Sequence, residues 1–162
     1  MWIELSNLWI VVLNLVAIPG IHFGLSWAYT RMPVHWFNPR SRWFREEAWE
    51  KEGAIYDSVF AIRKWKGLLP DAAPWFGGFA KGKLSDKDPD YIARFIIETC
   101  RGEAAHWAQV IGIWLTILWN PWPVAALVML VYGVISNLPC LLLQRFTRAR
   151  LRRLLSEITR ET

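Results

Sequence analysis

A histidine, two glutamates and an arginine lie close together in the segment IETCRGEAAHW, just before a long uncharged stretch begins. In a helix, residues three apart are neighbours, so Glu103 can orient or charge the imidazole of His106, and Glu98 can pair with Arg101. A histidine beside a carboxylate can act as a general base on a hydroxyl group. The same spacing is also typical of a structural ion pair, so a catalytic and a structural interpretation both remain open.

A second set of polar side chains lies where the last apolar stretch of the chain changes into an arginine cluster. At about 100° per residue, Asn137, Gln144 and Arg148 fall on one side of a helix, and Arg145 directly follows Gln144. Polar groups are costly against lipid, so such side chains usually face a bundle interior or a wet cavity. Cationic groups placed there can hold phosphates or a developing oxyanion.

Three further cations, Arg63, Lys64 and Lys66, surround the indole of Trp65. Cations near a helix end can hold the phosphates of a substrate. Contact with anionic lipid headgroups explains the same pattern more simply, and both interpretations stay open.

The sequence offers little for other kinds of catalysis. It has no G-x-S-x-G motif, so direct transfer, in which a base activates an acceptor hydroxyl, fits better than a covalent acyl-enzyme. It has no H-E-x-x-H motif and only three scattered histidines, so we expect no metal site. The two cysteines, Cys100 and Cys140, form no CxxC pattern and are typical of buried apolar positions.

Composition and charge distribution indicate an all-α integral membrane protein with a single domain, residues 1–162. The chain is 54% hydrophobic and has 12 tryptophans, which is high for a soluble domain of this size. Its charges gather in the middle and at the end, and long uncharged runs lie between them. We expect three membrane-spanning helices at about residues 8–29, 104–120 and 123–144, the first with a kink or local loosening at Pro19.

The section between the first two expected spans, residues 30–103, is too charged to cross a membrane. Ile55, Val59 and Ile62 recur at helical spacing within it. This pattern predicts one amphipathic helix over residues 46–66, lying along the cytoplasmic surface of the membrane.

A long loop is predicted after this helix. The stretch from Gly67 to Pro89 is rich in proline and glycine and is longer than a plain connector needs to be. Loops of this length are often functional, and this one could cover a site at the membrane surface. Pro89 and Asp90 then mark the start of the next helix.

The basic residues fix the expected orientation. The tail, residues 145–162, carries a cluster of arginines, the section 30–103 is also basic, and the turn at 120–123 has no charge. By the positive-inside rule, the tail and the section 30–103 face the cytoplasm. The net charge of +5 could suggest nucleic acid, but the arginines border apolar runs. We therefore expect the cell membrane and its lipids as partner, and no nucleic acid.

Four separate blocks of the sequence carry a pattern that is found in a known family. They are Thr30-Arg31-Met32-Pro33 with Phe37; Glu50-Lys51-x-Gly53 with Ile62-Arg63-Lys64-Trp65-Lys66; Ile97-Glu98-Thr99-x-Arg101-x-Glu103-x-x-His106-Trp107; and Asn137-x-Pro139 with Gln144-Arg145-x-x-Arg148-x-Arg150-Leu151. In order and spacing these blocks resemble the glycosyl-4,4'-diaponeurosporenoate acyltransferase family, small membrane enzymes of staphyloxanthin-type carotenoid biosynthesis. Ala61 and Thr147 depart from the family pattern, in which we expect asparagine, and the apolar segments are richer in tryptophan.

The resemblance implies transfer of a fatty acyl group to a sugar hydroxyl of a glycosylated carotenoid or a related glycolipid at the membrane. It implies acyl-CoA or an acyl carrier protein as donor substrate and no further cofactor. His106 is then the expected general base, oriented by Glu103 and Glu98. The expected substrate-binding residues are Arg63, Lys64 and Lys66 for the donor's phosphates, Arg101, and Asn137, Gln144, Arg145 and Arg148 on the acceptor or oxyanion side.

Two other classes of protein remain open. A non-catalytic membrane subunit or lipid-binding adaptor could use the same polar side chains only to hold its helices together. An enzyme of another transfer type, acting on a membrane isoprenoid, is the third hypothesis. An enzyme requires that the polar side chains meet around a shared pocket at the inner leaflet.

Overall fold

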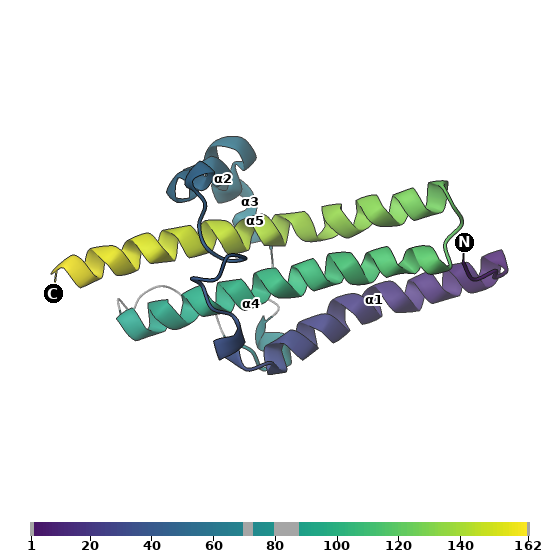
Figure 1. Cartoon of the computed structure of the whole chain (residues 1–162), viewed down its shortest axis with the longest axis horizontal. Coiled ribbons are helices and arrows are strands. Elements are labelled where there is room, and N and C mark those ends of the chain that lie inside the picture. Colours follow the sequence, from purple (N-terminus) through teal and green to yellow (C-terminus); the bar gives the residue numbers. More distant parts are fainter. Residues whose placement is uncertain (1, 70–72, 80–87, 162) are drawn as a thin grey trace.

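Three long helices form the body of the protein and lie side by side along its long axis (Figure 1). They are α1 (Asn7–Arg31), α4 (Pro89–Trp114) and α5 (Val124–Glu161), and α4 packs between α1 and α5. The computed structural model describes residues 2–69, 73–79 and 88–161, and within these ranges every regular element is a helix. The predicted all-α class is therefore confirmed.

Two of the long helices are long and apolar enough to cross a membrane, α1 and the stretch Val124–Arg160 of α5. α1 has no charged side chain before Arg31, and Ile10 is its one buried residue. The large apolar side chains that α1 exposes include Leu8, Trp9, Val11, Leu15, Val16 and Trp27. A helix with so much exposed apolar surface is consistent with membrane association.

The start of α4 follows from its first residues. The carboxylate of Asp88 caps the helix by accepting a hydrogen bond from the backbone N–H of Asp90 (3.0 Å). Pro89 occupies the first turn, where its missing N–H costs nothing. This start lies where the sequence predicts it. α1, in contrast, is one helix through Pro19, where the sequence predicts a kink or local loosening.

The prediction of one amphipathic helix over residues 46–66 is wrong, because the chain turns within it. Tyr56 and Ile62 are both buried against Phe146, although on a straight helix they would lie about 120° apart. The turn that brings both inward is at Ala61, whose φ is +49°. The stretch therefore consists of short helices: η2 (Ala48–Gly53), α2 (Ala54–Phe60), α3 (Ile62–Trp65) and η3 (Lys66–Leu68).

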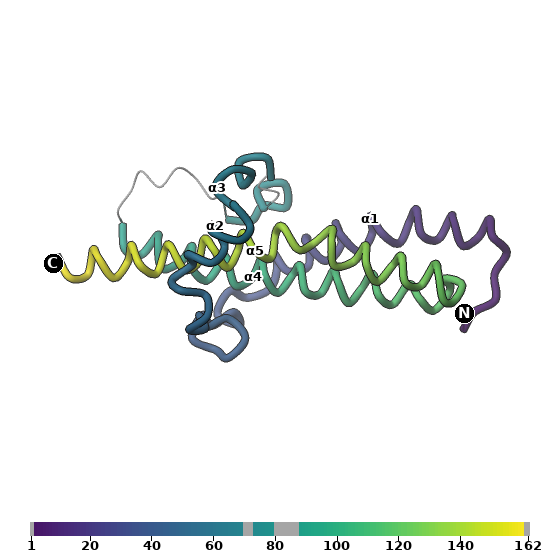
Figure 2. Tube along the Cα trace, turned by 90° about the horizontal axis from the view of Figure 1, so that it is seen from above, coloured from purple at the N-terminus to yellow at the C-terminus, as the bar shows by residue number. Residues whose placement is uncertain are grey.

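Gly53 allows this group of short helices to pack against α5. Figure 2 shows α2 and α3 beside α5. The φ of Gly53 is +85°, and a Cβ atom at this position would lie 3.0 Å from the Cβ of Ala149. The positive φ and the close approach each favour glycine. Residues 43–56 are thereby held against the helix that carries the arginine cluster.

The remaining short helices are η1 (Val34–Trp36), η4 (Ala73–Phe76) and η5 (Leu115–Leu118). η4 lies in the stretch predicted as a loop and packs against α1. Positions 70–72 and 80–87 of that stretch lie outside the described residues. The part of the predicted loop that is described therefore reaches the long-helix bundle.

The half of the bundle that contains the start of α4 and the end of α5 has apolar clusters at its edge and polar groups inside. Ile92 and Ile96 pack against Leu151, which joins the start of α4 to the end of α5. The buried polar and charged side chains are Glu50, Glu98, Thr99, Arg101, Glu103, Gln109, Asn137, Gln144 and Arg148, together with Thr116 and Asn120 at the other end. Buried polar groups need partners, and these partners define the candidate site.

Candidate active site

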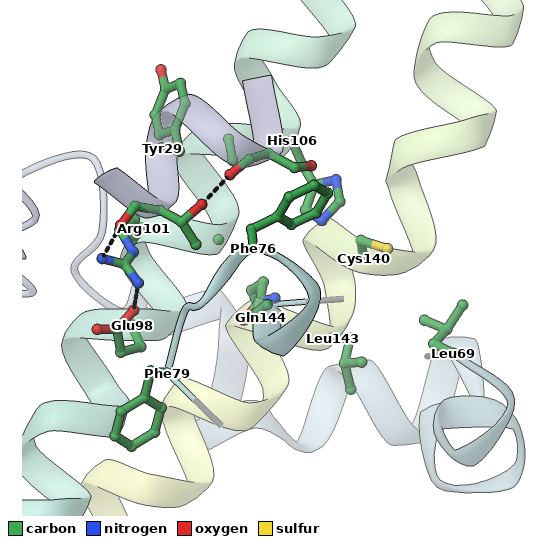
Figure 3. Close-up of a pocket in the computed structure, with 15 residues that line it drawn as sticks. Tyr29, Leu69, Phe76, Phe79, Glu98, Arg101, His106, Cys140, Leu143 and Gln144 are labelled. Atoms are coloured by element: carbon green, nitrogen blue, oxygen red, sulfur yellow. Dashed lines mark hydrogen bonds and ion pairs between the residues drawn. The ribbon is translucent and has the colours of Figure 1, made fainter. Parts of the chain in front are cut away.

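A cavity of about 310 Å³ lies between α1, α4, α5 and η4. Figure 3 shows side chains from these elements surrounding it, with the imidazole of His106 among them. Its polar lining comes from Ser26, Tyr29, Thr30, Glu98, Arg101, His106, Cys140 and Gln144, and its apolar lining includes Leu69, Phe76, Phe79 and Leu143. The cavity thus combines groups that can handle protons and hydroxyls with surface that can hold an apolar chain.

The imidazole of His106 is held by two carboxamides. Its Nδ1 lies 3.1 Å from Oε1 of Gln109 and 3.0 Å from Oδ1 of Asn137. Gln109 follows His106 by one helical turn on α4, whereas Asn137 reaches it from α5. Both carboxamides are buried, so they can fix the ring without competition from water.

Glu103 does not have the role that its spacing from His106 suggests. Its Oε1 accepts from Nε of Arg145 (2.8 Å), and its Oε2 accepts from a terminal nitrogen of Arg148. Glu103 and Arg148 are 2% and 3% exposed, so this is a buried ion pair. The expected orientation of His106 by Glu103 is therefore corrected: Glu103 joins α4 to the arginines of α5, and carboxamides hold the ring.

The same ion pair extends into the short helices. Arg145 also donates to Oε1 of Glu50 (2.5 Å) and to the carbonyl oxygen of Trp43 (3.0 Å). The hydroxyl of Tyr56 donates to the second oxygen of Glu50 (2.8 Å). Burial, followed by this hydrogen bond, raises the pKa of Tyr56 well above its ordinary value, so the hydroxyl stays protonated and remains a donor. The network Glu50–Arg145–Glu103–Arg148 fastens residues 43–56 to the bundle.

Glu98 and Arg101 pair with each other, as their spacing predicts, and both border the cavity. Oε2 of Glu98 lies 2.5 Å from a terminal nitrogen of Arg101, and Oε1 accepts from Nε of Arg94 (2.9 Å). Arg101 also donates to the carbonyl oxygen of Thr30 at the end of α1 (3.3 Å). This pair presents a carboxylate and a guanidinium on the wall of the cavity that faces α1 (Figure 3).

Gln144 reaches the cavity because Gly102 leaves room for it. A Cβ atom on Gly102 would lie 2.8 Å from Nε2 and 2.9 Å from Cδ of Gln144. Any larger residue at this position would displace the carboxamide. Gly102 therefore determines where one of the predicted substrate-binding side chains lies.

The three cations expected to bind the donor are elsewhere. Arg63 pairs with Asp57 (3.2 Å) on the surface, and the ammonium of Lys66 lies 6.0 Å from the ring centre of Phe146. Within the described lining of the cavity, Arg63, Lys64 and Lys66 are not present. The chain nevertheless leads directly from Lys66 to Leu69, which does border the cavity.

A second, larger groove of about 760 Å³ lies on the opposite face of the α4–α5 pair. It is bordered mainly by aromatic and aliphatic side chains, including Trp43, Trp49, Trp107 and Leu138. Arg145 and Glu103 border this groove, and His106 borders the smaller cavity. The expectation of one shared pocket therefore holds for Glu98, Arg101, His106 and Gln144 and is wrong for Glu103 and Arg145, which lie on the other face of the helix pair.

The residue that the sequence-based prediction missed is Gln109. It lies three positions after His106, and the rule that helical residues three apart are neighbours was applied only to charged pairs. His22 and Ser26, four residues apart on α1, both contact Gln109. Among the described residues, no three His, Cys, Asp or Glu side chains are arranged to hold a metal ion.

Comparison with known proteins agrees with the resemblance seen in the sequence. The family model described as glycosyl-4,4'-diaponeurosporenoate acyltransferase matches residues 40–157. A protein of that name from Staphylococcus aureus (strain MRSA252) is 31% identical over 133 residues, which cover 81% of this chain and 79% of the relative. Its counterpart from strain Newman is 30% identical over 134 residues, covering 82% and 79%. No solved structure matches the chain. The chain belongs to the glycosyl-4,4'-diaponeurosporenoate acyltransferase family.

Proposed function

We propose that this protein is an acyltransferase that moves a fatty acyl group to a sugar hydroxyl of a glycosylated carotenoid or a closely related glycosylated terpenoid. Family membership supports the activity, and the names of the relatives support the acceptor. The observation that carries the proposal for this chain is the cavity in which a carboxamide-held imidazole lies among both polar and apolar groups.

The proposed reaction is a direct transfer with His106 as general base. The imidazole takes the proton of the acceptor hydroxyl while its oxygen bonds to the carbonyl carbon of the donor thioester. The carbon–sulfur bond then breaks, and the leaving thiolate receives the proton from the imidazole. Arg101 and Gln144 border the same cavity and carry N–H donors for the oxyanion or for sugar hydroxyls, while Glu98 can accept from a hydroxyl.

We further propose acyl-CoA or an acyl carrier protein as the donor, without another cofactor. Both donors carry their thioester at the end of a long flexible arm, far from their phosphates. The surface position of Arg63, Lys64 and Lys66 fits such a donor, because the phosphates can bind outside while the thioester enters beside Leu69. The apolar part of the cavity then holds the start of the acyl chain.

The proposed location is the cell membrane, with three spans and a cytoplasmic C-terminus. α4 is the third span in this proposal, because residues 104–144 contain no Asp, Glu, Lys or Arg. Large apolar side chains also face outward on this part of α4, on η5 and on α5, among them Trp107, Ile111, Leu115, Leu127, Val131 and Ile135. The arginines of the tail favour the cytoplasm for the 30–103 section and the C-terminus, so His106 lies near the inner leaflet.

The second candidate function is a non-catalytic membrane subunit or lipid-binding adaptor. The buried network Glu50–Arg145–Glu103–Arg148 favours it, since these groups hold helices together and do not line the cavity of His106. Such a protein needs a polar interior but no imidazole beside a cavity. The two functions therefore differ in what a change at His106 does.

The experiment is a lipid extraction from cells that make a glycosylated carotenoid and express the wild-type chain, His106→Ala or neither. With the wild-type chain, mass spectrometry should show a new species heavier than the glycoside by one fatty acyl group, and mild saponification should remove it. His106→Ala, expressed to the same level, should give no such species. Unchanged masses with the wild-type chain would contradict acyl transfer, and a mass increment of another kind would point to another transfer reaction.

A further inference from the structure

The two carboxamides beside His106 have only one orientation that their other partners allow. Nε2 of Gln109 lies 3.2 Å from the backbone carbonyl oxygen of His22 and 3.0 Å from Oγ of Ser26. Nδ2 of Asn137 lies 3.0 Å from the backbone carbonyl oxygen of Gly133. A backbone carbonyl can only accept, so the amide nitrogens must face these oxygens. The amide oxygens are then the atoms that face the imidazole.

This orientation decides where the proton of His106 sits. A carboxamide oxygen can only accept, and both oxygens lie within 3.1 Å of Nδ1. Nδ1 must therefore carry the hydrogen, which the two oxygens share. In the neutral ring the other nitrogen, Nε2, is then unprotonated and is the basic atom.

Gln109 is itself held in place from α1. Its Oε1 also lies 3.1 Å from Nδ1 of His22, so one amide oxygen accepts from two imidazoles. The His22 ring packs edge-on against Tyr132 of α5, with 6.5 Å between ring centres. Gln109 therefore has partners on α1 through both ends of its amide, and rotating it would break four hydrogen bonds at once.

We infer that Gln109, together with Asn137, is a positioning residue that fixes His106 as the Nδ1–H tautomer and so makes Nε2 the proton acceptor in acyl transfer. The part of this inference that concerns catalysis rests on the proposed function, because it says which nitrogen of His106 takes the proton in acyl transfer. The tautomer itself is a property of the protein without substrate. It can therefore be tested whether or not acyl transfer is the reaction.

The direct test is nitrogen NMR of the protein in detergent micelles, labelled with ¹⁵N-histidine and measured at a pH where the imidazoles are neutral. The chain has three histidines, so His22→Phe and His35→Gln identify the His106 signals. Wild-type His106 should show a protonated Nδ1 and an unprotonated Nε2. Protonation at Nε2 of His106 in the wild-type protein would overturn the inference, and the His22→Phe and His35→Gln proteins serve only to assign the signals.

Gln109→Leu tests the positioning role. With this oxygen removed, His106 should gain a measurable share of the Nε2–H form, and Asn137→Leu should act in the same direction. The expected loss in kcat is about 10- to 100-fold, by analogy with the range seen when a group that orients a metal-bound histidine is removed. KM for the acceptor should change little, because Gln109 does not border the cavity as described. An unchanged tautomer and an unchanged kcat in a folded Gln109→Leu protein would contradict the role.

Asn14→Leu is the matched control. The side chain of Asn14 is hydrogen-bonded to Asn120 (2.8 Å) and to the indole of Trp119 (2.9 Å). Neither of these hydrogen bonds involves a histidine. This variant also removes an interhelical carboxamide, but from the end of the bundle where α4 and α5 are joined (Figure 1). It should leave the tautomer and kcat as in wild type. A shift of the His106 tautomer in Asn14→Leu would show that general loosening, and not Gln109, controls the ring.

Discussion

Replacing Glu103 by glutamine should destabilise the protein strongly, because it removes the carboxylate shared by two arginines. Glu103 and Arg148 are 2% and 3% exposed, and Arg145 keeps a second carboxylate in Glu50. The main cost is therefore the charge of Arg148, left buried without its partner. Removing one member of a buried ion pair costs about 3–5 kcal/mol. For a chain of this size, 1 kcal/mol corresponds to about 2–4 °C, so the melting temperature should fall by about 6–20 °C.

The assay is thermal unfolding of the purified protein in detergent, followed by fluorescence of its 12 tryptophans. Glu47→Gln is the matched control, because Glu47 pairs with Arg45 (2.8 Å) at the surface, where 41% of the Glu47 side chain and 56% of the Arg45 side chain are exposed. Such a pair contributes at most about 1 kcal/mol, which corresponds to a shift of at most about 4 °C. The double variant Glu103→Leu, Arg148→Met should regain part of the loss, because it leaves neither charge buried alone. A Glu103→Gln melting temperature equal to that of Glu47→Gln would refute the structural role of this carboxylate.

Three further outcomes are expected. Gly102→Ala should raise KM for the acceptor, because its Cβ would displace the carboxamide of Gln144. It should change stability by less than about 1 kcal/mol, because the displaced group is the end of a flexible side chain and alanine is the better helix former. Unchanged kinetics would contradict this. An apolar maleimide should label Cys140, which borders the cavity, before Cys100, which is fully buried and whose thiol pKa is raised by burial. Peptide mass spectrometry measures the order of labelling, and equal labelling of the two cysteines would contradict this prediction. Arg63→Gln should change stability by less than about 1 kcal/mol, because the ion pair of Arg63 with Asp57 lies on the surface. It should raise KM for acyl-CoA if Arg63 binds the donor's phosphates, and an unchanged KM would remove Arg63 from the donor site.

The long helices could be predicted because their signals are local. The uncharged run of α1 and the Asp88–Pro89 start of α4 are visible in a few adjacent residues. The division of residues 46–66 into several short helices could not be predicted in this way. It depends on Tyr56 and Ile62 both packing against Phe146, which lies far along the chain. Hydrophobic periodicity within the segment carries no information about that partner.

The residues that border the cavity could be predicted better than the partners that each of them binds. Glu98, Arg101, His106 and Gln144 do border one cavity. The pairing failed at Glu103, because helical spacing offered a neighbour on the same helix, while arginines from α5 provide stronger partners for a buried carboxylate. A prediction from sequence considers oppositely charged residues at helical spacing first, because opposite charges attract each other. An uncharged carboxamide gives no comparable signal in a single sequence, although it can orient an imidazole equally well.

In the proposed function, His106 performs chemistry at the cavity and is not needed to hold the bundle together. The most direct measurement is acyl transfer and melting temperature on the same purified preparation of His106→Ala, beside wild type and Glu103→Gln. We expect His106→Ala to lose acyl transfer and to melt much closer to the wild-type temperature than Glu103→Gln does, because it removes a hydrogen-bond donor but leaves no buried ionised group without its partner. Near-normal turnover in His106→Ala, or a fall in melting temperature as large as that of Glu103→Gln, would contradict this expectation.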